Sequence, residues 1–275
     1  MQGGRVFVFL GTALAAVLAG CAHQPSGEIA AQLERAIAGP HRSEANRARD
    51  AHRHPRETLQ LFGVRPDMTV VEIWPGAGWY TEILAPLLRE GGKYYAAHFH
   101  LDGGGPRYRQ ASLLGYREML ASRPHLYNKV TVTAFDAPRH SAIAPAGSAD
   151  LVLTFRNVHN WSAAKSDEAS FRAFHEALKP GGVLGVVEHR ARDGTPLEQM
   201  IKTGYMTEAY VIALAERAGF RFAGKSEVNA NPRDTKDHLR GVWTLPPTFR
   251  LGDQERAKYR AIGESDRMTL KFIKP

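Results

Sequence analysis

Apolar positions recur along the chain with two different periods, which separate the expected strands from the expected helices. Short apolar or alternating runs predict seven strands, at residues 70–73, 93–99, 130–135, 150–155, 183–188, 220–228 and 268–273. Apolar spacings of three and four predict helices at residues 28–38, 57–62, 83–88, 108–121, 168–178 and 207–218. Because strands and helices alternate, we expect an α/β fold with a mostly parallel, Rossmann-like sheet and helices on both faces.

The same pattern divides the chain into segments. Residues 28–63 are helical in pattern and precede the first strand, so we interpret them as an N-terminal helical lid. Residues 64–275 form the main domain and include a polar insertion at about 229–264, longer than ordinary connections between elements. A chain of 275 residues suits one domain with such a lid.

The N-terminal residues have the features of an export signal. Arg5 supplies a positive charge, residues 6–17 are apolar and small, and the run Leu18-Ala19-Gly20-Cys21 follows. This run resembles the bacterial lipobox, in which Cys21 would become the lipidated first residue of the mature protein. We therefore expect a signal peptide at 1–20, a lipid-anchored tether at 21–27, and an exported, membrane-anchored protein facing the periplasm or cell exterior.

Composition narrows the class of protein further. The chain is 43% hydrophobic and carries a formal net charge of +8, without a run of basic residues interleaved with aromatic ones. We therefore expect a folded protein that binds no nucleic acid. Cys21 is the single cysteine, which excludes an intrachain disulfide and a cysteine-based metal site. The histidines and arginines of residues 43–55 lack regular ligand spacing, so we predict no metal.

One stretch organises the main domain: Val70-Val71-Glu72-Ile73-Trp74-Pro75-Gly76-Ala77-Gly78-Trp79-Tyr80-Thr81. A short strand ends near a carboxylate, breaks into a turn with two glycines, and continues into a helix. This unit opens many nucleotide-binding α/β folds, because glycines let the backbone approach a ligand closely. A tight turn without a ligand is the alternative interpretation.

Four motifs in order resemble those of class I S-adenosylmethionine-dependent methyltransferases, and specifically of a predicted exported bacterial group. They are the turn at 72–78, Asp136 after the third strand, the run at 149–152 that opens the fourth, and Leu178-Lys179-Pro180-Gly181-Gly182 before the fifth. The resemblance covers about residues 57–275. It implies a seven-stranded sheet that ends in an antiparallel hairpin, with S-adenosylmethionine as cofactor.

The resemblance also implies positions for the cofactor. Gly76 and Gly78 would let the backbone face its methionine half, Glu72 would contact its polar groups, and Asp136 would accept a hydrogen bond from the adenine amine. Trp79 and Tyr80 would lie over the pocket.

Two positions depart from the family pattern. Trp74 stands where a glycine is usual, and would either stack over the sulfonium as a cation–π partner or fill the pocket. The carboxylate expected after the second strand is absent, so we expect His98 or Asp102 to take its place at the ribose.

The segment after the fourth strand carries the predicted catalytic residues. Ligands bind outside the carboxyl ends of strands in such sheets, where this chain places Arg156, Asn157 and His159. His159 would orient or deprotonate a nucleophile, which makes these three the predicted catalytic set. Residues predicted to bind the substrate are His54, Trp161 and His189. A structural loop anchored by a tryptophan is the alternative.

Three functions remain open at this stage. The first is a methyltransferase acting on an unidentified small molecule. The second is a non-catalytic ligand-binding protein on the same fold, since fold does not fix function. The third, an NAD-dependent oxidoreductase, is disfavoured because Thr81 stands where a third glycine belongs and no acid ends the second strand.

Overall fold

The computed structural model describes residues 26–100 and 106–275, together with Met1. One seven-stranded sheet has the order β3-β2-β1-β4-β5-β7-β6. β1 to β5 are parallel, and β7 runs antiparallel to both β5 and β6. This confirms the expected mostly parallel sheet with a terminal antiparallel hairpin. The strands are β1 (Thr69–Ile73), β2 (Lys93–His98), β3 (Val130–Ala134), β4 (Ala149–Phe155), β5 (Leu178–His189), β6 (Arg221–Ser226) and β7 (Arg267–Ile273).

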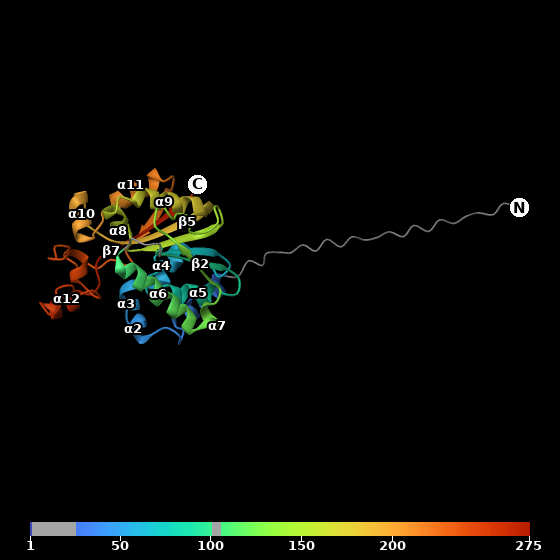
Figure 1. Ribbon diagram of the computed structural model, residues 1–275, viewed down its shortest axis with the longest axis horizontal. Helices are drawn as coiled ribbons and strands as arrows, with labels where there is room; N and C mark the ends of the chain where they lie inside the picture. The colour runs from blue at the N-terminus through green and yellow to red at the C-terminus, as the bar shows by residue number, and fades with distance from the viewer. Residues whose placement is uncertain (2–25, 101–105) are drawn as a thin grey trace.

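Helices cover both faces of the sheet (Figure 1). One face carries α1 (Ser26–Ile37), α4 (Pro55–Phe62), α5 (Thr81–Leu88) and α6 (Arg107–Ser122), and the other carries α9 (Asp167–Ala177) and α11 (Glu208–Arg217). The shorter helices are α2 (Glu44–Arg47), α3 (Asp50–Arg53), α7 (Pro124–Tyr127), α8 (Val158–Ala163), α10 (Leu197–Thr203), η1 (Gly241–Thr244) and α12 (Arg256–Ile262). Among the described residues, no helix is both long and apolar enough to cross a membrane.

The pleat of the strands explains the two cores. Val70 packs on the α4–α5 side with Phe62, while its neighbour Val71 packs on the other side, in the core that holds Phe171 and Phe174. All five side chains are at most 1% exposed. Successive side chains of a strand point to opposite faces, so near-continuous apolar runs are expected in a sheet covered on both sides.

The N-terminal segment is not one lid. Phe62 of α4 packs so closely on β5 that a Cβ at Gly185 would lie 2.7 Å from its ring, and Leu33 of α1 is buried in the same core. α1 and α4 are thus part of the packed domain, whereas α2 and α3 reach the carboxyl ends of the strands. Of the expected lid at residues 28–63, only about residues 44–53 lie beside the cleft, and their role as a lid stays a prediction.

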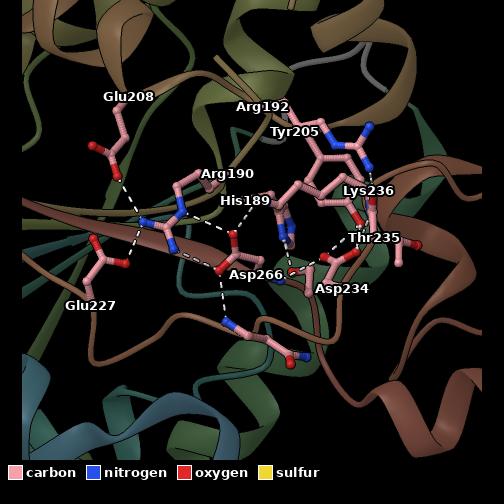
Figure 2. A network of polar contacts seen from close by, with 12 residues as sticks. His189, Arg190, Arg192, Tyr205, Glu208, Glu227, Asp234, Thr235, Lys236 and Asp266 are labelled. Atoms are coloured by element: carbon pink, nitrogen blue, oxygen red, sulfur yellow. Dashed lines mark hydrogen bonds and ion pairs between the residues drawn. The ribbon is translucent and has the colours of Figure 1, made fainter.

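The start of β5 and the content of the insertion differ from expectation. β5 begins at Leu178 rather than at 183, because Leu178 pairs with Ala149 of β4 and the amide of Gly181 donates to the carbonyl of Lys274. The insertion at 229–264 contains η1 and α12. Polar contacts hold it: Asp266, which accepts from Arg190, also accepts the amide of Asn231 at 2.8 Å, and Tyr205 donates to Asp234 at 2.9 and 3.0 Å (Figure 2).

Candidate functional site

A cleft of about 670 Å³ opens at the carboxyl ends of β1, β4 and β5. Its walls come from the turn after β1, the segment after β4, His189 at the end of β5, helices α2 and α3, and the insertion around Trp243. A crevice outside the carboxyl ends of the strands is where open α/β sheets bind their ligands. Separate parts of the sequence therefore meet in one candidate site.

The turn after β1 provides one wall. Gly76 has φ +60°, and a Cβ there would meet nothing within 4 Å, so its backbone is open to a ligand. Trp74 lines the cleft with φ +48°, and its indole N–H donates to the carbonyl of Phe135 at 3.0 Å. The Arg109 guanidinium lies 5.2 Å from the centroid of the Trp74 ring, so one aromatic face already has a cationic partner.

Glu72 does not line the cleft but lies buried below the turn. Tyr94 donates a short hydrogen bond to its carboxyl, and the Thr81 hydroxyl donates at 3.4 Å. Burial raises the pKa of Glu72 to about 7, against the opposing effect of these two hydrogen bonds. The structure therefore gives Glu72 a place beneath the turn and not among the residues that line the cleft, and its expected contact with the cofactor, direct or through water, stays a prediction.

His98 supports the same turn from the end of β2. Its Nδ1 accepts the Phe99 amide at 2.7 Å, so its Nε2 carries the proton and donates to the Gly76 carbonyl at 3.2 Å. Burial lowers the pKa of His98 to about 4, which keeps the ring neutral. Both ring nitrogens are engaged, so the expected role of His98 at the ribose does not match the geometry. Asp102, the other candidate, lies outside the described residues.

Gly78 and Tyr80 are also packed. A Cβ at Gly78, which has φ +87°, would lie 2.3 Å from the Met119 side chain on α6, so this glycine serves helix packing rather than ligand approach. Tyr80 is buried and stacks on Phe155 with ring centroids 3.7 Å apart. Its place below the cleft differs from the expected position over the pocket.

Asp136 lies at the end of β3, beside the cleft and not among the residues that line it. Its carboxylate accepts from Arg109 at 3.3 Å and from Arg139 at 2.9 Å, and its side chain is 25% exposed. The predicted contact with an adenine amine stays a prediction.

His159 and Glu188 form a hydrogen-bonded pair in the cleft wall. His159 Nδ1 donates to Glu188 Oε1 at 3.1 Å, which leaves Nε2 as the acceptor. Glu188, at the end of β5, also accepts the amides of Val158 at 2.6 Å and His189 at 2.8 Å. This fully buried carboxyl fixes the tautomer and the orientation of His159, the arrangement that a general base requires.

His189 lines the cleft next to this pair, with its ring centroid 5.4 Å from that of His159. Burial, followed by the electrostatic effects of His159 and Arg267, holds the pKa of His189 well below its ordinary value. Ligand atoms of His159, Glu188 and His189 lie within 4.8 Å of one another, a spacing that a metal could bridge. Because Glu188 already accepts several hydrogen bonds, we interpret the cluster as a device that orients histidine.

The other predicted residues divide into two groups. Arg156 (φ +64°) and Asn157 line the cleft, and Asn157 also donates to the Ile73 carbonyl at 3.1 Å, tying β4 to β1. Trp161 is only 1% exposed and lies in the core against Trp74. The prediction that Trp161 contacts the substrate is therefore wrong. His54 lies 3.4 Å from Asn229 and is not among the residues that line the cleft. Cys21 lies outside the described residues.

Sequence reasoning missed several residues of the cleft. Glu188 is hidden inside an apolar strand pattern, and Trp243 lies in an insertion with no recognisable period. Arg49 and Arg53 belong to the polar stretch at residues 43–55, whose sequence was read only for metal-ligand spacing. Arg267 begins β7 and carried no signal.

The architecture matches that of known methyltransferases. No family model and no curated protein matches the chain. Among solved structures, a SAM-dependent methyltransferase from Aquifex aeolicus is similar with a TM-score of 0.54 and 17% identity, over 90% of this chain and 98% of that one. A protein assigned as a sarcosine dimethylglycine methyltransferase from Galdieria sulphuraria gives 0.54 and 16%, over 83% and 84%.

A third similar structure is the [4+2]-cyclase SpnF, with a TM-score of 0.56 and 15% identity over 90% of this chain and 94% of that one. At such identities the similarity establishes the fold alone. The chain thus has the Rossmann-like fold of SAM-dependent methyltransferases, a fold that also occurs in a cyclase.

Proposed function

We propose that the protein is an S-adenosylmethionine-dependent methyltransferase acting on a small molecule. The observation that carries this proposal is the His159–Glu188 pair, which faces a cleft built over the Gly76 turn of a methyltransferase fold. A histidine base in a cleft lined by both aromatic and polar side chains suits a small substrate with an acidic proton.

The residues present fit part of this cofactor. The open backbone at Gly76 would accommodate its methionine half, and on the family pattern we propose that Asp136, after β3, accepts a hydrogen bond from its adenine amine. No carboxylate among the described residues takes the ribose position, where His98 is engaged by the backbone. When bound, S-adenosylmethionine supplies an electrophilic methyl group to a nucleophile.

The chain itself supplies a base and a shaped environment. His159 Nε2 accepts the proton of the attacking group, and the Glu188 carboxylate stabilises the imidazolium that results. Trp74 and Trp243 form apolar parts of the cleft wall. In-line displacement at a methyl group depends largely on holding the two reactants in position, which these walls provide.

A non-catalytic ligand-binding protein is the second candidate. Two departures from the family's sequence pattern favour it. Trp74 replaces the usual glycine, and the neutral, hydrogen-bonded His98 replaces the ribose carboxylate. An NAD-dependent oxidoreductase remains the third reading, on the fold alone. Binding of S-adenosylmethionine without binding of NAD, measured by calorimetry on the full-length protein, supports the first function over the third.

We also propose that the protein is an exported lipoprotein, anchored through Cys21 after removal of residues 1–20. The support is the order of charge, apolar run and lipobox in the sequence. Mass spectrometry of the membrane-extracted protein should find an acylated N-terminal Cys21. Unchanged processing and membrane fractionation in a Cys21→Ser variant would contradict the proposal.

A further inference from the structure

Four arginines converge on one side of the cleft, where α2, α3, the end of β4 and the start of β7 meet. All four line the cleft, and three of them also line a small pocket behind it. We call this group the arginine niche; its members are Arg49, Arg53, Arg156 and Arg267.

The niche holds more positive charge than the protein neutralises. Glu264 is the one carboxylate that pairs with any of these arginines in the part of the chain described. It lies 2.6 Å from Arg49 Nε and 3.6 Å from Arg53 Nε, and it forms a short contact with Arg267. The Arg156 guanidinium has no hydrogen bond or ion pair with any described residue. Four guanidinium groups and one carboxylate leave three uncompensated positive charges.

The surroundings make this charge costly. Arg53 is 5% exposed and Arg267 2%, and the Nε group of each is buried without a hydrogen-bond partner among the described residues. Burial and the neighbouring Arg267 lower the pKa of Arg156 to about 10. Buried donors and like charges are normally paired in native proteins, so four arginines that share one carboxylate beside a cleft indicate a missing partner.

The missing partner is an anion. A cation would meet the same positive potential that already lowers the pKa of His189, and a neutral group would leave the charges uncompensated. Guanidinium groups bind carboxylate and phosphate oxygens through paired, charge-assisted hydrogen bonds. Contacts fix the niche in advance, because Arg53 lies 4.6 Å from the Trp79 ring centroid and Arg267 donates to the His52 carbonyl at 3.1 Å.

We propose that the arginine niche binds the carboxylate or phosphate group of the substrate, so that the substrate is a small organic acid. The methylation of this acid rests on the proposed function, whereas the binding of its anionic group does not. His189 lines the cleft close to both the niche and His159. An acid held in the niche thus extends toward the His159 base.

The test compares anionic and neutral probes on the full-length protein without cofactor. Benzoate represents a carboxylate, inorganic phosphate represents a phosphate, and benzamide is the neutral counterpart of benzoate. We expect benzoate or phosphate to bind by calorimetry, and benzamide to bind at least about tenfold more weakly. Which anion binds more tightly identifies the group that the substrate carries.

Arg156→Gln is the decisive variant, because its guanidinium makes no hydrogen bond or ion pair with a described residue that the substitution would break. We expect it to weaken the affinity for the more tightly bound anion by about tenfold or more. In the absence of anion it should raise the midpoint of thermal unfolding, because it relieves repulsion between the arginines. Arg217→Gln removes an exposed arginine of α11 as a matched control, and should change neither value. A lower midpoint of thermal unfolding with unchanged anion affinity would show that the arginines stabilise the fold and do not bind the anion, which would overturn the inference.

A last comparison separates the substrate from the cofactor, whose methionine half also carries a carboxylate. Affinities for S-adenosylhomocysteine and for methylthioadenosine, which lacks that carboxylate, should respond equally to Arg156→Gln. Selective weakening of S-adenosylhomocysteine would assign the niche to the cofactor and overturn the inference. Anion binding without any cofactor binding would instead overturn the proposed function and leave the niche in place.

Discussion

At the scale of single residues, the structure changes the roles of the most conspicuous side chains. Glu72 and His98 look from the sequence like ligand contacts, because each lies at the end of a strand. The structure buries both and bonds them beneath the Gly76 turn. The sequence predicts which residues gather around the turn, but not which side of it they occupy, because that depends on partners such as Tyr94 that are distant in the chain.

The buried Glu72 should make stability depend on pH. In the unfolded chain this carboxyl ionises near its ordinary pKa of 4.5, whereas in the folded protein it keeps its proton up to about 7. Its contribution to stability is therefore lost as the pH rises from about 4.5 to 7. We expect Glu72→Gln to gain up to about 3 kcal/mol in the free energy of unfolding, relative to wild type, across that window.

Urea unfolding at several pH values measures this difference. Glu90→Gln, which changes an 84% exposed carboxyl, is the matched control and should run parallel to wild type. Parallel curves for Glu72→Gln as well would show that Glu72 is ionised throughout and that the buried, protonated state is wrong.

At the scale of elements, the apolar pattern predicts the seven strands and the longer helices because each buries a regular apolar face. It does not predict α2, α3 or α8, which are four to six residues long and have little room for a period. These short helices and the insertion supply much of the cleft. The site was therefore less predictable than the fold, and the arginine niche least of all, since its members are separated by up to about two hundred residues.

The turn after β1 offers an element-scale test. Gly78→Ala places a methyl against Met119 at a φ of +87°, so it should destabilise the protein by about 1–3 kcal/mol. Gly76→Ala carries a similar backbone cost of about 1–2 kcal/mol without the clash, but its methyl enters the open cleft.

We thus expect Gly78→Ala to lower stability more, and Gly76→Ala to lower cofactor affinity more. Thermal unfolding and calorimetry on both variants measure the two effects. The opposite order of affinities would return Gly78 to the ligand site.

At the scale of the whole molecule, the fold does not decide between chemistries. SpnF, a [4+2]-cyclase, is as similar in structure as the methyltransferases from Aquifex aeolicus and Galdieria sulphuraria. Function therefore has to be argued from the site. Our proposal of an enzyme that methylates a small acid rests on the His159–Glu188 pair, the open turn at Gly76 and the arginine niche.

Calorimetric titration of the full-length protein with S-adenosylmethionine tests this central claim most directly. We expect one binding site per chain, an affinity about ten- to a hundredfold weaker than a ribose carboxylate would give, competition by S-adenosylhomocysteine, and no binding of NAD. Absence of both heat and thermal stabilisation at saturating S-adenosylmethionine, in protein that still unfolds cooperatively, would contradict the methyltransferase assignment and favour the ligand-binding protein.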